Sequence, residues 1–513
     1  MQGNKRCLRG FEVGSTSLML LLVCATLWLI SCTPDAGLQP PEDQIDVTRQ
    51  SEESHDIVID RPTMMEEEVM LNPDLVSMEY SLTAVTDVVE LGDLTVMNGT
   101  LYMTAVLARN HSGLYRVEGR NISLVTDDFL SISGIVTADM NLYFIGEDGA
   151  HGKELWVSDG TESDTRLVKD IRPGPGGSDI GEMAAFRGHL YFGANDGEHG
   201  NELWRSDGTE GGTELVADIH PTSSSNPAWL TAVDQKMFFS ALAEDIGREL
   251  WVTDGTHTKL VMQVNSSYYD YRPTNLRVVN NDLFFTVGVG SASIGKSLYW
   301  IDGSTTEIRL LTIDSGFVSD KLRLSNINRV TGEFISNPIS SSSAFDYIQF
   351  PVVAKSRLFF SSGYLLWWSD GLEAQLVTDS RLRPILEPRN LLGSADLLFF
   401  AASDKAYGEE LWRSDGTEEG TFMIADINPV GGSFPVPLFY DQGWLYFVAT
   451  DGENGRKLWV TNGLTDQVIL VSDPAWEKDN LSVLDMVAAQ GDIYFVGSMR
   501  GQADQLWRLH WED

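Results

Sequence analysis

Acidic side chains that could bind a cation recur at regular intervals along this chain. Asp148, Asp196 and Asp451 each open a turn of the form Asp-Gly-x-x-Gly. Further aspartates follow the last strand expected in a repeat unit: Asp127, Asp170, Asp218, Asp379, Asp426 and Asp473. Ca²⁺ takes about six to eight oxygen ligands, so these positions form a calcium-site hypothesis. Each aspartate can instead cap its own turn, and we prefer that interpretation because it explains the recurrence without a ligand.

Histidine and serine give no comparable indication of catalysis. His151 and His199 occupy equivalent positions, but two histidines without a third ligand make a weak zinc site. The sequence shows no Ser-His-Asp spacing, glycine-rich phosphate loop or HExxH motif. Paired carboxylates are too frequent in so acidic a chain to indicate an acid–base pair. We therefore assign no catalytic residue, although linear spacing does not test a triad assembled from separate repeats.

These residues are positioned by a repeat whose clearest copies are Glu154–Thr161, Glu202–Thr209 and Glu410–Thr417. The aromatic position of that octapeptide can be followed through nine units: Tyr115, Trp156, Trp204, Trp251, Tyr299, Trp367, Trp412, Trp459 and Trp507. Most are separated by about 47 residues, the length of one four-stranded propeller blade. The repeat therefore predicts an all-β propeller.

Within a unit, short apolar runs alternate with Asp-Gly turns, which is typical of a β-meander. The aromatic position falls on the third strand, and we predict that its side chains form the core between blades rather than a ligand site. The tryptophans at this position are Trp156, Trp204, Trp251, Trp367, Trp412, Trp459 and Trp507. Ser-Asp-Gly-Thr follows as a hairpin. It is similar in kind to the Asp-box of sialidase propellers, where a like turn is structural and non-catalytic.

The two ends of the repeat array indicate that the ring is closed. The last unit stops at Asp513 without a fourth strand, whereas Ala84–Val88 copies the fourth-strand pattern of Leu215–Ile219 before the first complete unit. An N-terminal strand that completes the last blade would remove an exposed sheet edge. We predict one closed propeller of nine blades over residues 79–513. Since propellers typically have about four to eight blades, a ring of eight with residues near 300–370 packed outside is the alternative.

One interval between aromatic positions is longer than the others, which places an insertion at about residues 315–346. It lies between the fourth strand of one blade and the first strand of the next, on the same face as the Asp-Gly-x-x-Gly turns. Long loops in compact domains are often functional, although a tolerated disordered insertion is the alternative. The candidate binding residues are Asn326, Asn328, Arg329, Phe334, Asn337, Phe345 and Tyr347.

The N-terminal segment has the features of an export signal. A basic start precedes the apolar run Leu18–Ile30, which is shorter than the roughly 20 residues of a spanning helix. Leu29–Cys32 resembles the lipobox of bacterial lipoproteins, in which the signal is removed before a cysteine that is then acylated. This implies a signal peptide over residues 1–31 and lipidation at Cys32. Thr33, in place of aspartate, favours the outer membrane or cell surface of a Gram-negative bacterium.

Composition restricts the partners. A net charge of -38 should repel nucleic acid and anionic lipid headgroups. Residues 32–78 lack the repeat and are acidic and proline-containing, which predicts a flexible tether. The other cysteines, Cys7 and Cys24, lie in the expected signal, so the exported chain has no disulfide. We expect a monomer held to the membrane by lipid, with no cofactor except the calcium considered above.

The Glu-Leu-Trp-x-Ser-Asp-Gly-Thr units resemble the ELWxxDGT repeat family of bacterial exported proteins, sometimes labelled hyalin-like, over residues 80–513. The units at Tyr115, Tyr299 and Trp367 depart from the pattern. The resemblance implies a fold and an exported location, and no reaction. Two functional hypotheses follow: a non-enzymatic surface lipoprotein that binds a protein or glycan partner, and a propeller hydrolase or lyase that acts on surface polysaccharide.

Overall fold

The computed structural model of the chain separates Met1–Glu68 from a larger unit, Val69–Asp513, that contains the repeats. The structure describes residues 80–86, 90–106, 112–263, 271–289, 297–303, 308–311, 321–323, 348–463, 468–471, 480–499 and 503–511. The expected signal peptide, Cys32 and the tether lie outside these ranges. No helix long and apolar enough to span a membrane occurs within them.

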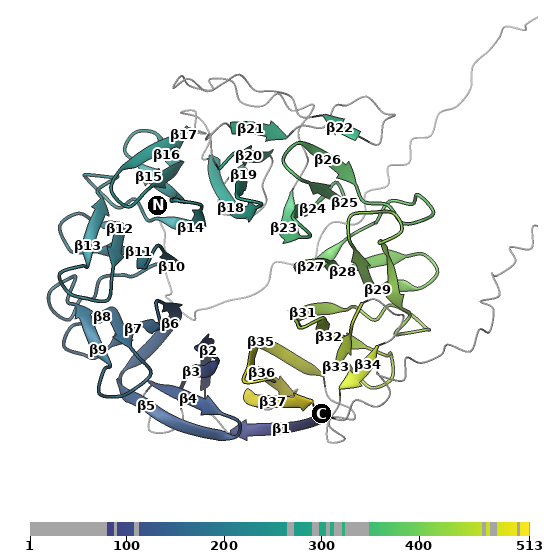
Figure 1. The fold of residues 1–513 in the computed structure, drawn as a ribbon, viewed down its shortest axis with the longest axis horizontal. Coiled ribbons are helices and arrows are strands. Elements are labelled where there is room, and N and C mark those ends of the chain that lie inside the picture. The colour runs from purple at the N-terminus through teal and green to yellow at the C-terminus, as the bar shows by residue number, and fades with distance from the viewer. Residues whose placement is uncertain are drawn as a thin grey trace, which may run out of the picture. The chain divides into compact units, whose positions relative to one another are not determined.

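The described part of the larger unit is all-β, and its strands form nine antiparallel sheets, or blades, arranged in a ring (Figure 1). Blade 1 consists of β2 (Glu90–Met97), β3 (Thr100–Val106), β4 (Ser112–Glu118) and β5 (Asn121–Phe129). Blade 2 consists of β6 (Ser131–Ala138), β7 (Asn141–Glu147), β8 (Lys153–Ser158) and β9 (Arg166–Lys169). Blade 3 consists of β10 (Met183–Phe186), β11 (His189–Asn195), β12 (Asn201–Ser206) and β13 (Glu214–Ala217).

The next three blades contain the irregular region of the sequence. Blade 4 consists of β14 (Ala228–Val233), β15 (Lys236–Ala243), β16 (Gly247–Thr253) and β17 (Thr258–Met262). Blade 5 consists of β18 (Tyr271–Val279), β19 (Asp282–Val289), β20 (Ser297–Ile301) and β21 (Ile308–Leu311). Blade 6 consists of β23 (Gln349–Ala354), β24 (Arg357–Ser362), β25 (Leu365–Ser369) and β26 (Glu373–Leu376), to whose edge β22 (Lys321–Arg323) adds a fifth strand.

The last three blades complete the ring. Blade 7 consists of β27 (Arg389–Gly393), β28 (Leu398–Asp404), β29 (Gly408–Ser414) and β30 (Phe422–Ala425). Blade 8 consists of β31 (Val436–Asp441), β32 (Trp444–Thr450), β33 (Arg456–Thr461) and β34 (Ile469–Val471). Blade 9 consists of β35 (Leu481–Ala489), β36 (Asp492–Met499) and β37 (Gln505–Trp511), with β1 (Tyr80–Thr86) as its fourth strand.

The pairing of β1 with β37 confirms the predicted closure. The register places Tyr80 opposite Trp511 and Leu82 opposite Leu509. The closing strand begins four residues before the predicted segment at Ala84. All nine aromatic positions lie on the third strand of their blade, so the nine-bladed prediction is confirmed and the eight-bladed alternative is wrong.

The hydrophobic core is divided among the interfaces between blades. One cluster contains Tyr143 and Leu155 of blade 2 together with Phe192 and Trp204 of blade 3. Aromatics on the second strand, such as Phe192, are fully buried and pair with the third-strand aromatic. Among the predicted core tryptophans, Trp204, Trp412 and Trp507 are buried, and Trp156, Trp251, Trp367 and Trp459 are half-buried. Each blade therefore needs its neighbours to bury its faces.

The first strand of each blade lies nearest the ring axis (Figure 1), and we call it the inner strand. Every inner strand except β10 has a register shift that marks a β-bulge. A bulge bends its strand and frees a backbone N–H from the ladder. The inner strands therefore carry irregular backbone that can bond to neighbouring blades.

Candidate ligand site on the crossover face

The propeller has two unlike faces. The turn face carries the connections between the first and second strands and between the third and fourth strands of each blade. The crossover face carries the connections between the second and third strands, and those that lead into the next blade. The Ser-Asp-Gly-Thr turns lie on the turn face and the Asp-Gly-x-x-Gly turns on the crossover face, as expected from the strand order.

The Ser-Asp-Gly-Thr turn satisfies its own polar groups. Ser206 Oγ accepts the Gly208 N–H at 3.0 Å, and Asp207 Oδ1 accepts the N–H and hydroxyl of Thr209 at 2.9 and 2.7 Å. The copies at Ser158–Thr161 and Ser414–Thr417 repeat these bonds. These bonds hold the hairpin, and in the third copy Asp415 Oδ2 also accepts from Lys355 Nζ of the preceding blade at 2.8 Å.

The glycine of this turn has a second structural role. Gly208 has a φ of 86°, and a Cβ added there would lie 2.7 Å from the hydroxyl of Tyr143 in the preceding blade. Gly255 has a φ of 93°, and a Cβ there would lie 2.6 Å from the hydroxyl of Tyr191. Glycine is therefore required both for the positive φ and for the close approach of two blades.

The glutamate of the repeat is buried and binds the crossover that follows its blade. Glu202 is fully buried, and its carboxylate accepts the backbone N–H groups of Ile219 and Ser225 at 2.9 and 2.8 Å. Glu410 accepts from Ile427 and Ser433 in the same way. We did not predict this role from the sequence. The available signal was the serine that follows each glutamate after 23 or 24 residues.

Burial also changes the protonation of these carboxyl groups. Burial raises the pKa of Glu154 to about 7, although Ser178 Oγ and the N–H of Arg172 donate to its carboxylate at 2.6 and 3.1 Å. Burial likewise raises the pKa of Glu202 and Glu410. Because all three are fully buried, they act on the fold rather than on a dissolved ligand.

The Asp-Gly-x-x-Gly turns use their carboxylates locally. Asp148 accepts the N–H groups of Ala150 and His151, and its other oxygen lies 2.6 Å from His151 Nδ1. Asp196 and His199 repeat this pair at 2.7 Å. Hydrogen bonding to the aspartate raises the pKa of each histidine. Each histidine thus pairs with its own aspartate.

Asp451 is arranged like the other two turn aspartates and accepts from the backbone and side chain of Asn454. Within the described ranges, no group of three or more His, Cys, Asp or Glu side chains is placed to hold a metal ion. The geometry thus agrees with turn capping, and calcium binding stays a prediction.

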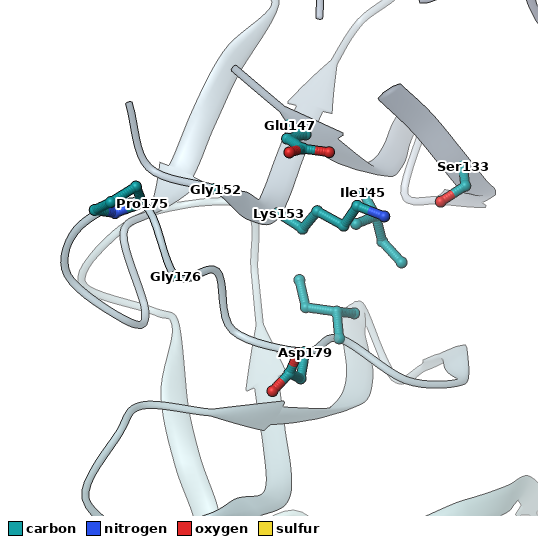
Figure 2. A pocket seen from close by; sticks show the side chains of 9 residues that line it. Ser133, Ile145, Glu147, Gly152, Lys153, Pro175, Gly176 and Asp179 are labelled. Atoms are coloured by element: carbon teal, nitrogen blue, oxygen red, sulfur yellow. The ribbon is translucent and has the colours of Figure 1, made fainter. Parts of the chain in front are cut away.

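A cavity of about 550 Å³ lies on the crossover face beside the Asp148 turn (Figure 2). Blade 2 contributes one wall from β6, β7 and the start of β8, and the crossover into blade 3 contributes the other. The lining residues are Ser133, Ile145, Glu147, Gly152, Lys153, Pro175, Gly176, Asp179 and Ile180.

The cavity lies where the blades depart from a recurring contact. In blade 3, Asn201 donates to the carbonyl of Asp179 in the preceding crossover at 2.7 Å. Arg248 and Arg456, at the equivalent position of blades 4 and 8, donate to the carbonyls of Asn226 and Phe434 at 2.9 and 3.2 Å.

Blade 2 has Lys153 at that position, and the crossover before it is a single residue, Leu130, between β5 and β6. This crossover is too short to cover the edge of the blade. The Lys153 ammonium has no hydrogen bond or ion pair with the residues that the structure describes. It extends instead across the cavity toward Ser133, as Figure 2 shows.

The lining combines charges of both signs with two isoleucines. Glu147 accepts a hydrogen bond from Ser131 Oγ at 2.9 Å, and Asp179 is exposed on the opposite wall. With Lys153, these groups offer donors and acceptors to a hydroxylated ligand, while Ile145 and Ile180 supply apolar contact. The lining contains neither histidine nor cysteine, so it has no nucleophile–base pair of the Ser-His or Cys-His kind.

The binding loop predicted from the sequence cannot be compared with this cavity. All seven of its candidate residues, from Asn326 to Tyr347, lie outside the described residues. The described part of the insertion is β22, which pairs with β26 at the outer edge of blade 6. The cavity was not predicted from the sequence. Two features could have indicated it: a lysine at position 153, and the single residue Leu130 between two neighbouring strands.

No family model and no curated protein matches this chain. Among solved structures it is similar to the computationally designed Ika8 protein, at 13% identity and a TM-score of 0.38 over 82% of this chain and 96% of that one. A structure from a study of two prolyl endopeptidases matches at 10% identity and a TM-score of 0.38, over 81% of this chain and 55% of that one. Puromycin hydrolase matches at 9% identity and a TM-score of 0.36, over 80% of this chain and 58% of that one. The chain spans little more than half the length of the last two, and similarities this weak say nothing of its ligand or reaction.

Proposed function

We propose that this chain is a bacterial surface lipoprotein whose propeller is a non-enzymatic scaffold that binds a protein or glycan partner. The observation that supports binding on the crossover face is the cavity at Lys153. There the polar side chains depart from the repeat, whereas three Ser-Asp-Gly-Thr turns of the opposite face form the same internal hydrogen bonds. The resemblance to ELWxxDGT repeat proteins agrees with an exported scaffold.

In this proposal the lipid on Cys32 holds the chain at the outer membrane or cell surface, and residues 32–78 tether the propeller. A single acyl chain binds a bilayer only marginally, so stable anchoring requires more than one chain. Labelling cells with radioactive palmitate should mark the wild-type chain and leave a Cys32→Ser variant unlabelled. Equal labelling of both chains would refute the anchor.

The cavity can be tested separately from the anchor. The full chain, applied to an array of defined glycans, should bind a hydroxyl-rich member, and Lys153→Ala and Glu147→Gln should each weaken that binding at least about tenfold. Lys259→Ala is the matched control, because Lys259 is exposed on β17, an outer strand. Binding that is equal in all four proteins would show that the cavity is not the site.

A further inference from the structure

Four inner strands contain the same β-bulge, and its first residue has a positive φ each time. The values are 65° for Gly134, 59° for Trp229, 55° for Asn275 and 52° for Asn390. Glycine and asparagine adopt this conformation readily, whereas a bulky side chain rarely does. Trp229 is the exception, and backbone outliers of this kind often accompany function.

The backbone of the bulge does not require the indole. The Trp229 N–H donates to Glu182, from the approach to blade 3, at 2.5 Å. The Gly134 N–H donates in the same way to Asp93 of blade 1 at 2.7 Å. Because glycine supports this arrangement in blade 2, the bulge itself does not require the indole, whose contacts are with the core between blades 4 and 5 and with Arg277.

Arg277 of the next inner strand, β18, lies beside this indole. Its guanidinium carbon is 6.0 Å from the centroid of the Trp229 ring, and its Nε donates to the carbonyl of Pro351 at 3.3 Å. Burial lowers the pKa of Arg277. The negative charge of Glu182 raises this pKa, without a hydrogen bond between the two side chains. Among the residues that the structure describes, no carboxylate forms an ion pair with this half-buried cation, so an anionic group would stabilise it.

We propose that Trp229 and Arg277 form a second site, apart from the Lys153 cavity, that binds an acidic glycan, a chain of sugars that carry carboxylates, at the inner strands of blades 4 and 5; this goes beyond the proposed function. Arg277 Nε and Nη1 donate to the carbonyls of Pro351 and Leu276 at 3.3 and 2.9 Å, and the remaining N–H groups of the guanidinium can donate to a carboxylate. The half-buried indole packs on the core between these blades and keeps an exposed part that can cover the C–H face of a sugar ring. Glu182 retains acceptor capacity for a sugar hydroxyl.

Calorimetric titration of the full chain with trigalacturonate, and with maltotriose as the neutral comparison, tests this site. The acidic trisaccharide should bind and the neutral one should bind at least about tenfold more weakly. Trp229→Gly, which copies blade 2, and Arg277→Gln should each reduce affinity for trigalacturonate at least about tenfold. Trp229→Asn, which copies blades 5 and 7, replaces the glycine variant if that variant loses its circular dichroism spectrum.

The inference is overturned if trigalacturonate does not bind, or if it binds these variants as well as the wild type. Equally tight binding of a hexaglutamate peptide that is lost in the same variants would also overturn it, because the ligand would then be an acidic peptide. Lys153→Ala should leave trigalacturonate binding unchanged. If glycan binding on the array depends on Lys153 and not on Trp229 or Arg277, the proposed function stands and only this inference is refuted.

Discussion

Replacement of Glu154 by glutamine should remove a pH-dependent part of the stability of the propeller. The pKa of Glu154 is about 7 in the folded chain, against an ordinary value of 4.5. The folded chain therefore holds a proton that the unfolded chain has lost between about pH 4.5 and 7, so this residue's contribution falls as pH rises through that window. At about 1.4 kcal/mol per pH unit, the difference of about 2.5 units corresponds to about 3.5 kcal/mol.

Glutamine does not titrate, so the stability of Glu154→Gln relative to wild type should increase by up to about 3.5 kcal/mol from pH 4.5 to pH 8. Loss of one acceptor for the N–H groups of Ile171 and Arg172 adds a penalty that is the same at each pH. Urea unfolding at pH 4.5, 6, 7 and 8 measures the difference, and subtracting the wild-type curve cancels the effect of net charge. Glu198→Gln, at an exposed glutamate, is the control. A relative stability that is constant within about 0.5 kcal/mol would refute the reasoning.

Other substitutions test the repeat itself. Gly208→Ala should destabilise the chain by about 1–3 kcal/mol in thermal unfolding, because the φ of Gly208 is positive and an added Cβ would meet the preceding blade. Gly211 has open space around it and no positive φ, so Gly211→Ala should be near neutral in the same assay. Trp204→Ala should cost about 3–5 kcal/mol in urea unfolding because the side chain is only 6% exposed, and a cost below 1 kcal/mol would contradict its place in the core. NMR titration of His199 should give a pKa above its ordinary 6.5, and Asp196→Asn should abolish this shift. The contribution of the His199–Asp196 pair to the stability of the fold is therefore greatest at low pH and is lost as pH rises through the pKa of the folded chain.

The repeat was readable because one residue type recurs at a fixed structural position. Trp204 and Trp412 occupy the same place on β12 and β29, so their spacing predicts the blade, and the unpaired segment near Ala84 predicts closure. Both inferences depend only on order along the chain. That is why the nine blades could be predicted.

The buried glutamates and the cavity depend on relations that the repeat pattern does not show. Glu202 binds backbone groups 17 and 23 residues away, and nothing in its own octapeptide indicates that partner. The cavity lies where Leu130 alone joins two blades, so the Lys153 ammonium has no carbonyl of a preceding crossover to bond, as its counterparts in blades 3, 4 and 8 have. Sequence analysis of one unit could not find a site created by the difference between neighbouring units.

The pairing of β1 with β37 also means that the ring can close only when both strands are present. Tyr80 faces Trp511, so the seam joins strands from opposite ends of the repeat array, which are synthesised at different times. Intermediate chains present β1 and the growing array as unpaired sheet edges until β37 has been made. Until then the unpaired β1 must be kept from pairing with other chains.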